Sequence, residues 1–241
     1  MAVGSPQTLT EADRRIVAVW AAECAERVLG LFEAEAPRDS RPRDAIARTR
    51  AFARGELDTA DEIRRRFVAH VAAREVSAPA AVAAARAAGQ AASVSHMGAH
   101  ALGAAAYAAT AAGLAAPDRP EALSEEIRWQ LGCMSVAARA ALRQLPPIGE
   151  NSSGPLGSGL LASGVLGSII RELQASCLTP TESRSDFTGT LLAVANSDKK
   201  PGQRRVNKRV PNHPNSPEGN SAQPCRFRRA PQLARDAGVH F

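Results

Sequence analysis

The chain has 241 residues and a mass of 25.3 kDa, which suffices for one domain or two. Fifty residues are alanine, whereas aromatic residues make up only 4%. A β-sandwich or β-barrel would need more β-branched and aromatic side chains, so this composition disfavours those classes and favours helices. Composition alone does not indicate a function.

The net charge of +6 is unevenly distributed along the chain. Residues 1–195 contain 20 Arg, no Lys and 21 Asp+Glu, whereas residues 196–241 contain 10 Lys+Arg and 3 Asp+Glu. The end of the chain is therefore basic and the rest is nearly neutral. Proline and polar residues also replace the apolar periodicity there. We therefore expect a helical domain over residues 10–175 and a disordered basic tail over residues 176–241.

Basic clusters in this tail are candidates for binding phosphate groups without sequence preference. They contain Lys199, Lys200, Arg204, Arg205, Lys208 and Arg209. Phe227 is the only aromatic residue among the basic clusters of the tail, which gives little support for base stacking. Weak nucleic-acid binding through the tail is one open hypothesis, and a merely solvated tail is the other.

Neither a secretory signal nor a membrane span is predicted from the sequence. A polar N-terminus leads directly into a charged stretch that begins at Glu11. The uncharged run 87–117 is mostly alanine, which gains little on transfer into lipid, and the run 151–170 contains five glycines. The four cysteines are far apart and match no zinc pattern. We therefore expect a cytoplasmic protein with reduced thiols.

Apolar periodicity and capping signals predict a compact, alanine-rich, all-α bundle of about six to seven helices. Thr10 with Asp13 caps a first helix that buries Trp20 and ends before Pro37. Further helices are predicted over residues 42–54, 59–76, 79–95, 96–114, 120–131 and 135–144, which makes seven with the first, and residues 165–175 could add a last short one. Thr59 and Glu62 are expected to cap the helix over residues 59–76, and Ser135 is expected to cap the helix over residues 135–144.

The segment 69–116 contains 24 alanines in 48 positions. Together with Gly89, Gly98 and Gly103, these small residues allow helix backbones to approach closely. We therefore expect the two helices of this segment to lie at the centre of the bundle.

Several segments resemble one known family. They begin at Glu11 (EADRR), Trp20 (WAAECAERVL), Pro42 (PRDAI), Ala51 (AFARGE), Ala85 (ARAAGQA) and His96 (HMGAHALGAAAY). The chain is similar there to the helical "putative immunity protein" group associated with bacterial polymorphic toxins, over about residues 10–145 and at most to 175. The resemblance implies a non-enzymatic protein that binds and neutralises a cognate toxin.

Three histidines support an alternative interpretation. His96 and His100 are four apart, which would place both on one face of a helix, and His70 could supply a third imidazole to a metal. A metal-dependent hydrolase or exonuclease-related protein is therefore the second hypothesis. Against it, the run 87–117 contains no carboxylate, and many family members carry histidine where this chain has Gln90. We expect these histidines to form hydrogen bonds between packed helices, with no cofactor and no catalytic residue.

The sequence does not identify the partner-binding residues, and exposed acidic residues are only candidates for them. Glu125 and Glu126 are predicted on a solvated face, where carboxylates could steer a basic toxin. Trp129 is a candidate interface residue, although the core is slightly favoured for it, and Trp20 is expected in the core.

Overall fold

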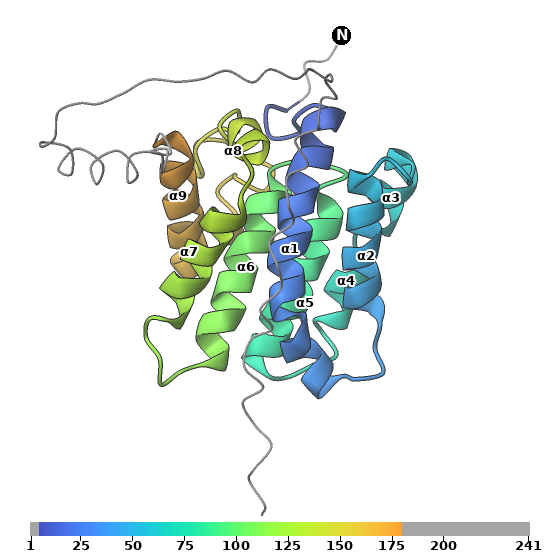
Figure 1. Cartoon of the computed structure of the whole chain (residues 1–241), viewed down its shortest axis with the longest axis vertical. Helices are drawn as coiled ribbons and strands as arrows, with labels where there is room; N and C mark the ends of the chain where they lie inside the picture. The colour runs from blue at the N-terminus through green and yellow to red at the C-terminus, as the bar shows by residue number, and fades with distance from the viewer. Residues whose placement is uncertain (1–4, 180–241) are drawn as a thin grey trace, which may run out of the picture. The chain divides into compact units, whose positions relative to one another are not determined.

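A computed structural model describes residues 5–179 of the chain (Figure 1). These residues form nine α-helices and one short 3₁₀-helix, and no β-strand occurs among them. The all-α prediction is thereby confirmed. The elements are α1 (Glu11–Glu35), α2 (Arg41–Ala53), α3 (Thr59–Arg65), α4 (Val68–Ala72), α5 (Pro79–Ser93), α6 (His100–Ala115), α7 (Ala122–Cys133), α8 (Val136–Leu142), η1 (Leu160–Ala162) and α9 (Gly164–Leu178).

Helices α1, α5 and α6 pack together as the centre of the bundle, with α2 to α4 on one side and α7 and α9 on the other (Figure 1). Alanines such as Ala84 and Ala88 on α5 and Ala105 and Ala108 on α6 are fully buried. Because alanine has no side chain beyond Cβ, these helices lie close together, as the sequence predicted. The rigid middle of the molecule is thus built from small residues.

Larger side chains fill the space around this centre. Trp20 of α1 is 2% exposed, and its indole nitrogen donates a hydrogen bond to the backbone oxygen of Gln130 at 2.8 Å. Burying the ring while satisfying its single polar group makes Trp20 a strong anchor between α1 and α7. Its predicted place in the core is confirmed. Leu173 and Ile170 of α9 are also fully buried.

Helix ends follow the expected chemistry in two cases and depart from it in a third. The hydroxyl oxygen of Thr10 accepts a hydrogen bond from the backbone of Asp13 at 3.1 Å, and that of Ser135 accepts one from Ala138 at 3.0 Å. For α3, the cap is Asp58, whose carboxylate accepts hydrogen bonds from the backbone N–H groups of Ala60 and Asp61. The predicted cap at Thr59 was therefore one residue late, because an ionised carboxylate is a stronger acceptor than a hydroxyl.

The helix predicted over residues 59–76 is divided into α3 and α4 around Arg66 and Phe67. The predicted helix ran continuously through both residues. The Phe67 ring remains 58% exposed, and the Arg66 guanidinium lies over it at 4.2 Å. The break turns α4 so that Ala69 and Ala72 are the residues that bury against the bundle.

The link between α5 and α6 also differs from the prediction. A helix starting at His96 was expected, but α6 begins at His100. The backbone N–H groups of Gly98 and Ala99 donate to the carbonyl oxygens of Thr8 and Gln7, at 2.9 and 3.0 Å. These donors are thus committed to the N-terminal segment, so the helix starts after them. His96 and His100 consequently do not share a helix face.

The last helix is longer than predicted. α9 continues to Leu178, beyond the predicted end at residue 175, and Cys177 is buried beside Met134 with the sulfur atoms 3.7 Å apart. Apart from its first four residues, the predicted tail lies outside the described residues. Within residues 5–179, none of the helices combines the length and the apolar character needed to cross a bilayer.

Candidate binding pocket

A hollow of about 460 Å³ lies between α4, the C-terminal end of α5, the N-terminal half of α6 and the loop before α9. It gathers the three histidines that the sequence had singled out, His70, His96 and His100, together with Gln90 and Tyr107. The opposite wall comes from residues 154–161, including Leu160. The pocket is therefore assembled from segments up to about 90 residues apart in sequence, which only folding brings together.

Gln90 and His100 form the polar floor of this pocket. Nδ1 of His100 lies 2.8 Å from Oε1 of Gln90. Because a carboxamide oxygen can only accept, the imidazole donates through Nδ1 and leaves Nε2 as the unprotonated nitrogen. No partner of Nε2 occurs among the described residues. Burial lowers the pKa of His100 to about 3, so the ring is neutral at pH 7.

Glycines make room for two of these side chains. A Cβ atom on Gly89 would lie 2.6 Å from Nδ1 of His70, and one on Gly103 would lie 2.5 Å from Oε1 of Gln90. Both contacts are shorter than carbon can make with these atoms. These glycines were expected to bring helix backbones together. They also leave space for the polar side chains of the pocket.

The charges around the pocket are cationic. Burial is the main cause that lowers the pKa of His70 and of His96, and Arg86 and Arg74 add to the effect at His70. Arg66 and Arg14 act in the same direction at His96. A positive field opposes protonation of an imidazole and attracts an anion.

These arginines differ from many others in the fold. Ion pairs join α-helical arginines elsewhere to carboxylates, as between Arg50 and Glu26. Among the described residues, none of the ion pairs involves the four arginines near the histidines, which are Arg14, Arg66, Arg74 and Arg86. The positive charge beside the pocket is therefore not neutralised by a carboxylate in direct contact.

Apolar side chains flank the mouth of the pocket. Phe67 is 58% exposed and Leu160 is 63% exposed, and both line it. The predicted helix over residues 59–76 ran through Phe67, and no helix was predicted between residues 144 and 165. No pattern in the sequence marked either residue for this place, since the break before α4 and the course of the loop depend on tertiary packing.

The metal hypothesis receives mixed support from this geometry. The structure does bring His70, His96 and His100 to one pocket, as that hypothesis required. Within residues 5–179, however, no group of three His, Cys, Asp or Glu side chains is placed to hold a metal ion. Nδ1 of His100 is engaged by Gln90, and the surrounding arginines repel a cation.

The two acidic candidates for partner binding differ in their exposure to solvent. Glu125 is exposed and pairs with Arg119 at 2.6 Å. Glu126 is only 5% exposed, so its predicted place on a solvated face is wrong. Its side chain turns inward because Arg27 donates to it at 2.6 Å and Gln130 contacts it at 3.4 Å. Burial nevertheless raises the pKa of Glu126.

Trp129 lies beside this buried carboxylate. It is half-buried, and the guanidinium of Arg27 lies 4.2 Å from the centre of its ring. Arg27 thus bridges Trp129 and Glu126 on the surface of α7. The tryptophan therefore contributes to packing, while part of its ring stays open to solvent.

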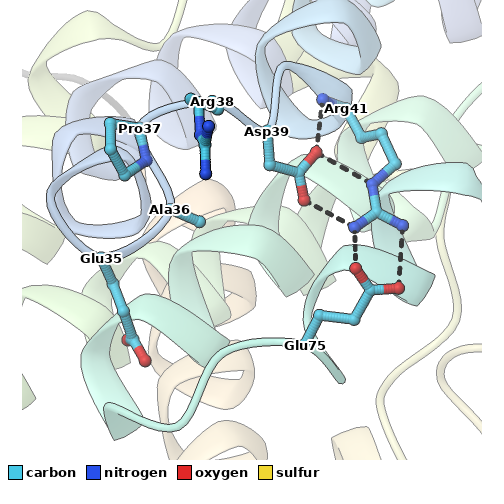
Figure 2. A pocket seen from close by; sticks show the side chains of 7 residues that line it. All are labelled: Glu35, Ala36, Pro37, Arg38, Asp39, Arg41 and Glu75. Atoms are coloured by element: carbon cyan, nitrogen blue, oxygen red, sulfur yellow. Dashed lines mark hydrogen bonds and ion pairs between the residues drawn. The ribbon is translucent and has the colours of Figure 1, made fainter.

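A second hollow, of about 480 Å³, lies at the turn between α1 and α2. Figure 2 shows Arg41 there with its guanidinium between the carboxylates of Asp39 and Glu75. Glu35 accepts hydrogen bonds from the backbone of Ser77 and Ala78. Apart from that of Arg38, the charges of this hollow are thus satisfied within the chain. We therefore interpret the hollow as a structural feature at which polar contacts connect helices.

The proposed nucleic-acid contacts, Lys199, Lys200, Arg204, Arg205, Lys208 and Arg209, lie outside the described residues. Binding of nucleic acid through the tail therefore stays a prediction.

The fold and the pocket together define a class: an all-α protein with an alanine-packed centre and one open, cationic pocket with apolar flanks. A family model, Imm-5 like putative immunity protein, matches residues 7–137, which is more than half of the chain. The chain belongs to this family, and the suspected resemblance is confirmed. Neither the curated proteins nor the solved structures that were searched gave a match.

Proposed function

We propose that this chain is an immunity protein that binds a cognate protein toxin and neutralises it without catalysing a reaction. The observation that carries the proposal is the family match over residues 7–137. This range includes α1, α5 and α6, and it also includes the pocket residues from Arg66 to Tyr107. In this proposal, the buried alanines supply a rigid support and the pocket supplies a contact site. We propose the cytoplasm as its location.

The structural features that support a binding role are rigidity and an open surface. The helices that hold the pocket are fully packed behind it, so a partner would meet a preformed shape and little ordering entropy would be lost. The exposed acids expected to meet a basic toxin are poorer candidates, because Glu125 is already paired with Arg119 and Glu126 is buried.

Co-expression with the product of a neighbouring toxin gene would test the proposal. We expect growth to be restored, and the purified proteins to form a complex of fixed stoichiometry by isothermal titration calorimetry. The purified chain alone should show no phosphodiesterase or protease turnover. Turnover that depends on added zinc or manganese and disappears in His70→Ala would instead favour the hydrolase hypothesis.

A further inference from the structure

The histidine pocket contains polar groups that the fold leaves unused. Among the described residues, neither Nε2 of His100 nor the hydroxyl of Tyr107 has a hydrogen-bond partner. The His70 side chain likewise makes no hydrogen bond there. All three residues line the open hollow, so these polar groups are available to a ligand that enters it.

The charged residues around the pocket favour an anionic ligand. The titratable and charged groups that influence the three histidines are Arg14 on α1, Arg66 before α4, Arg74 after α4, Arg86 on α5, and the histidines themselves. No carboxylate is among the influences on these rings. A ligand with a negative group would meet an unneutralised positive field, and a cation would be repelled.

The size and the rim of the pocket select the kind of anion. The hollow of about 460 Å³ would hold one or two side chains. Of the four nearby arginines only Arg66 lines the hollow, and His100 is neutral at pH 7. One fixed charge at close range suits a monoanion better than a doubly charged phosphate. Phe67 and Leu160 at the mouth offer apolar contacts to residues on either side of the charged one.

We propose that this pocket binds a glutamate or aspartate side chain that the partner protein presents between apolar residues. This inference rests on the proposed function and specifies the chemistry of the toxin surface. The carboxylate would accept hydrogen bonds from the Tyr107 hydroxyl and from Arg66. Phe67 and Leu160 would cover its apolar neighbours. The charge relation is the reverse of the one predicted from the acidic surface residues, since the immunity protein provides the positive side.

The test uses the full chain, labelled with ¹⁵N at histidine, and three blocked tripeptides as probes. The peptides are acetyl-leucyl-glutamyl-leucinamide and its glutamine and lysine counterparts. We expect the glutamate peptide to shift the His70 and His100 signals saturably and to bind about fivefold more tightly than the glutamine peptide. That ratio is the one expected between hydrogen bonds to charged and to neutral acceptors. Equal binding of the three peptides, or no shift of these signals, would overturn the proposal.

The pH dependence provides a second readout. A bound carboxylate favours protonation of a nearby imidazole, and the pKa of each imidazole of the pocket is lowered below 6.5 in the free protein. Affinity for the glutamate peptide should therefore increase as the pH falls from about 7 to about 5.5, where the peptide carboxylate is still mostly ionised. Binding of the glutamine peptide should not increase. An identical pH profile for both peptides would count against a carboxylate site.

Two variants separate the charge from the apolar contacts. Arg66→Gln should abolish the preference for glutamate over glutamine, and Leu160→Ala should weaken both peptides equally. Arg128→Gln on α7 removes an exposed arginine on another side of the bundle and is the matched control. Unfolding curves of all three variants establish that they are folded.

Parallel co-expression with the toxin distinguishes the two proposals. Loss of protection in Arg66→Gln, with the glutamate preference present in the unaltered chain, supports both. Protection without any glutamate preference overturns the pocket assignment and leaves the immunity function standing. Glutamate preference without protection by the unaltered chain contradicts the immunity function and supports the chemistry of the pocket.

Discussion

Nδ1 of His100 lies 2.8 Å from Oε1 of Gln90 and thereby joins the first residue of α6 to the side of α5. The bond fixes the orientation of the imidazole, and its second nitrogen has no partner among the described residues. It also explains why a histidine can lie in this alanine-rich centre without charge. One hydrogen bond thus serves both the packing of two central helices and the chemistry of the pocket.

Replacing Gln90 with leucine should remove this acceptor and leave the His100 N–H unpaired. We expect the free energy of unfolding to fall by about 1–3 kcal/mol, the usual cost of an unsatisfied buried polar group. Urea denaturation measures the change. Gln144→Leu alters an exposed glutamine and should change stability by less than about 0.5 kcal/mol. Equal losses in both variants would show that the bond contributes nothing specific.

The lowered pKa of His100 should make the fold sensitive to acid. The ring stays neutral in the folded state down to about pH 3, whereas it protonates near its ordinary pKa of about 6.5 when the chain unfolds. Protons therefore bind the unfolded state preferentially, and stability should be lost as the pH falls below about 6.5, by at most about 1.4 kcal/mol per pH unit from this group.

NMR titration of the imidazole signals checks the protonation directly, and unfolding curves between pH 4.5 and 7 check the loss of stability. His100→Gln should show a smaller slope with pH. A signal from His100 that titrates near pH 6.5 in the folded protein would contradict the prediction.

Gly89→Ala should destabilise the protein, because the added Cβ would lie 2.6 Å from the His70 ring. We expect a loss of about 1–3 kcal/mol from this overpacking. Gly30→Ala on α1 has open space around the added carbon and should instead stabilise by about 0.5–1 kcal/mol through helix propensity. Thermal unfolding compares the two. The double change Gly89→Ala with His70→Ala should recover stability relative to Gly89→Ala, and no recovery would refute the clash.

Arg27→Met should leave the Glu126 carboxylate buried without its cation. We expect a loss of about 1–3 kcal/mol at pH 7.5, reduced from the full buried-pair value because Arg27 is partly exposed. Burial already raises the pKa of Glu126, so this loss should shrink as the pH falls and the carboxyl group protonates. Arg119→Met, which breaks exposed pairs with Glu121 and Glu125, should cost less than about 0.5 kcal/mol.

A chain that ends at Thr179 should unfold cooperatively at nearly the same temperature as the full chain, since the apolar residues that pack on α6 precede that point. Its helical circular dichroism should also be retained. Any nucleic-acid binding should disappear with residues 180–241, and in the full chain it should be weak, with a Kd of about 10⁻⁴–10⁻⁶ M, and strongly salt-dependent. Binding that persists in the shortened chain would place the contacts elsewhere.

The helical class and most helix positions could be predicted because they depend on local signals. Thr10 and Ser135 satisfy nearby backbone groups, and Pro37 interrupts the chain wherever it lies. The burial of Trp20 also followed from a regular apolar face. These features are encoded within one or two helical turns, so a single sequence suffices to find them.

The pocket could be predicted only in part, because its geometry depends on distant segments. The histidines were found as a group, yet the start of α6 at His100 depends on backbone hydrogen bonds to Gln7 and Thr8, about 90 residues earlier. Glu126 turned inward because Arg27, from α1, lies opposite it. Contacts of this kind leave no periodic signal.

The loop before α9 has a consequence for how related proteins could differ. Gln7 is almost fully buried and holds this loop, because its side chain donates to the Ser153 carbonyl oxygen at 2.8 Å and accepts from the Leu156 N–H at 2.9 Å. The family match ends at residue 137, so one wall of the pocket lies inside the matched range and the wall with Leu160 lies beyond it. Exchanging the loop would therefore redesign the entrance while the central helices stay unaltered. The residues that shape the entrance on this side are thus separate from those that build the central helices.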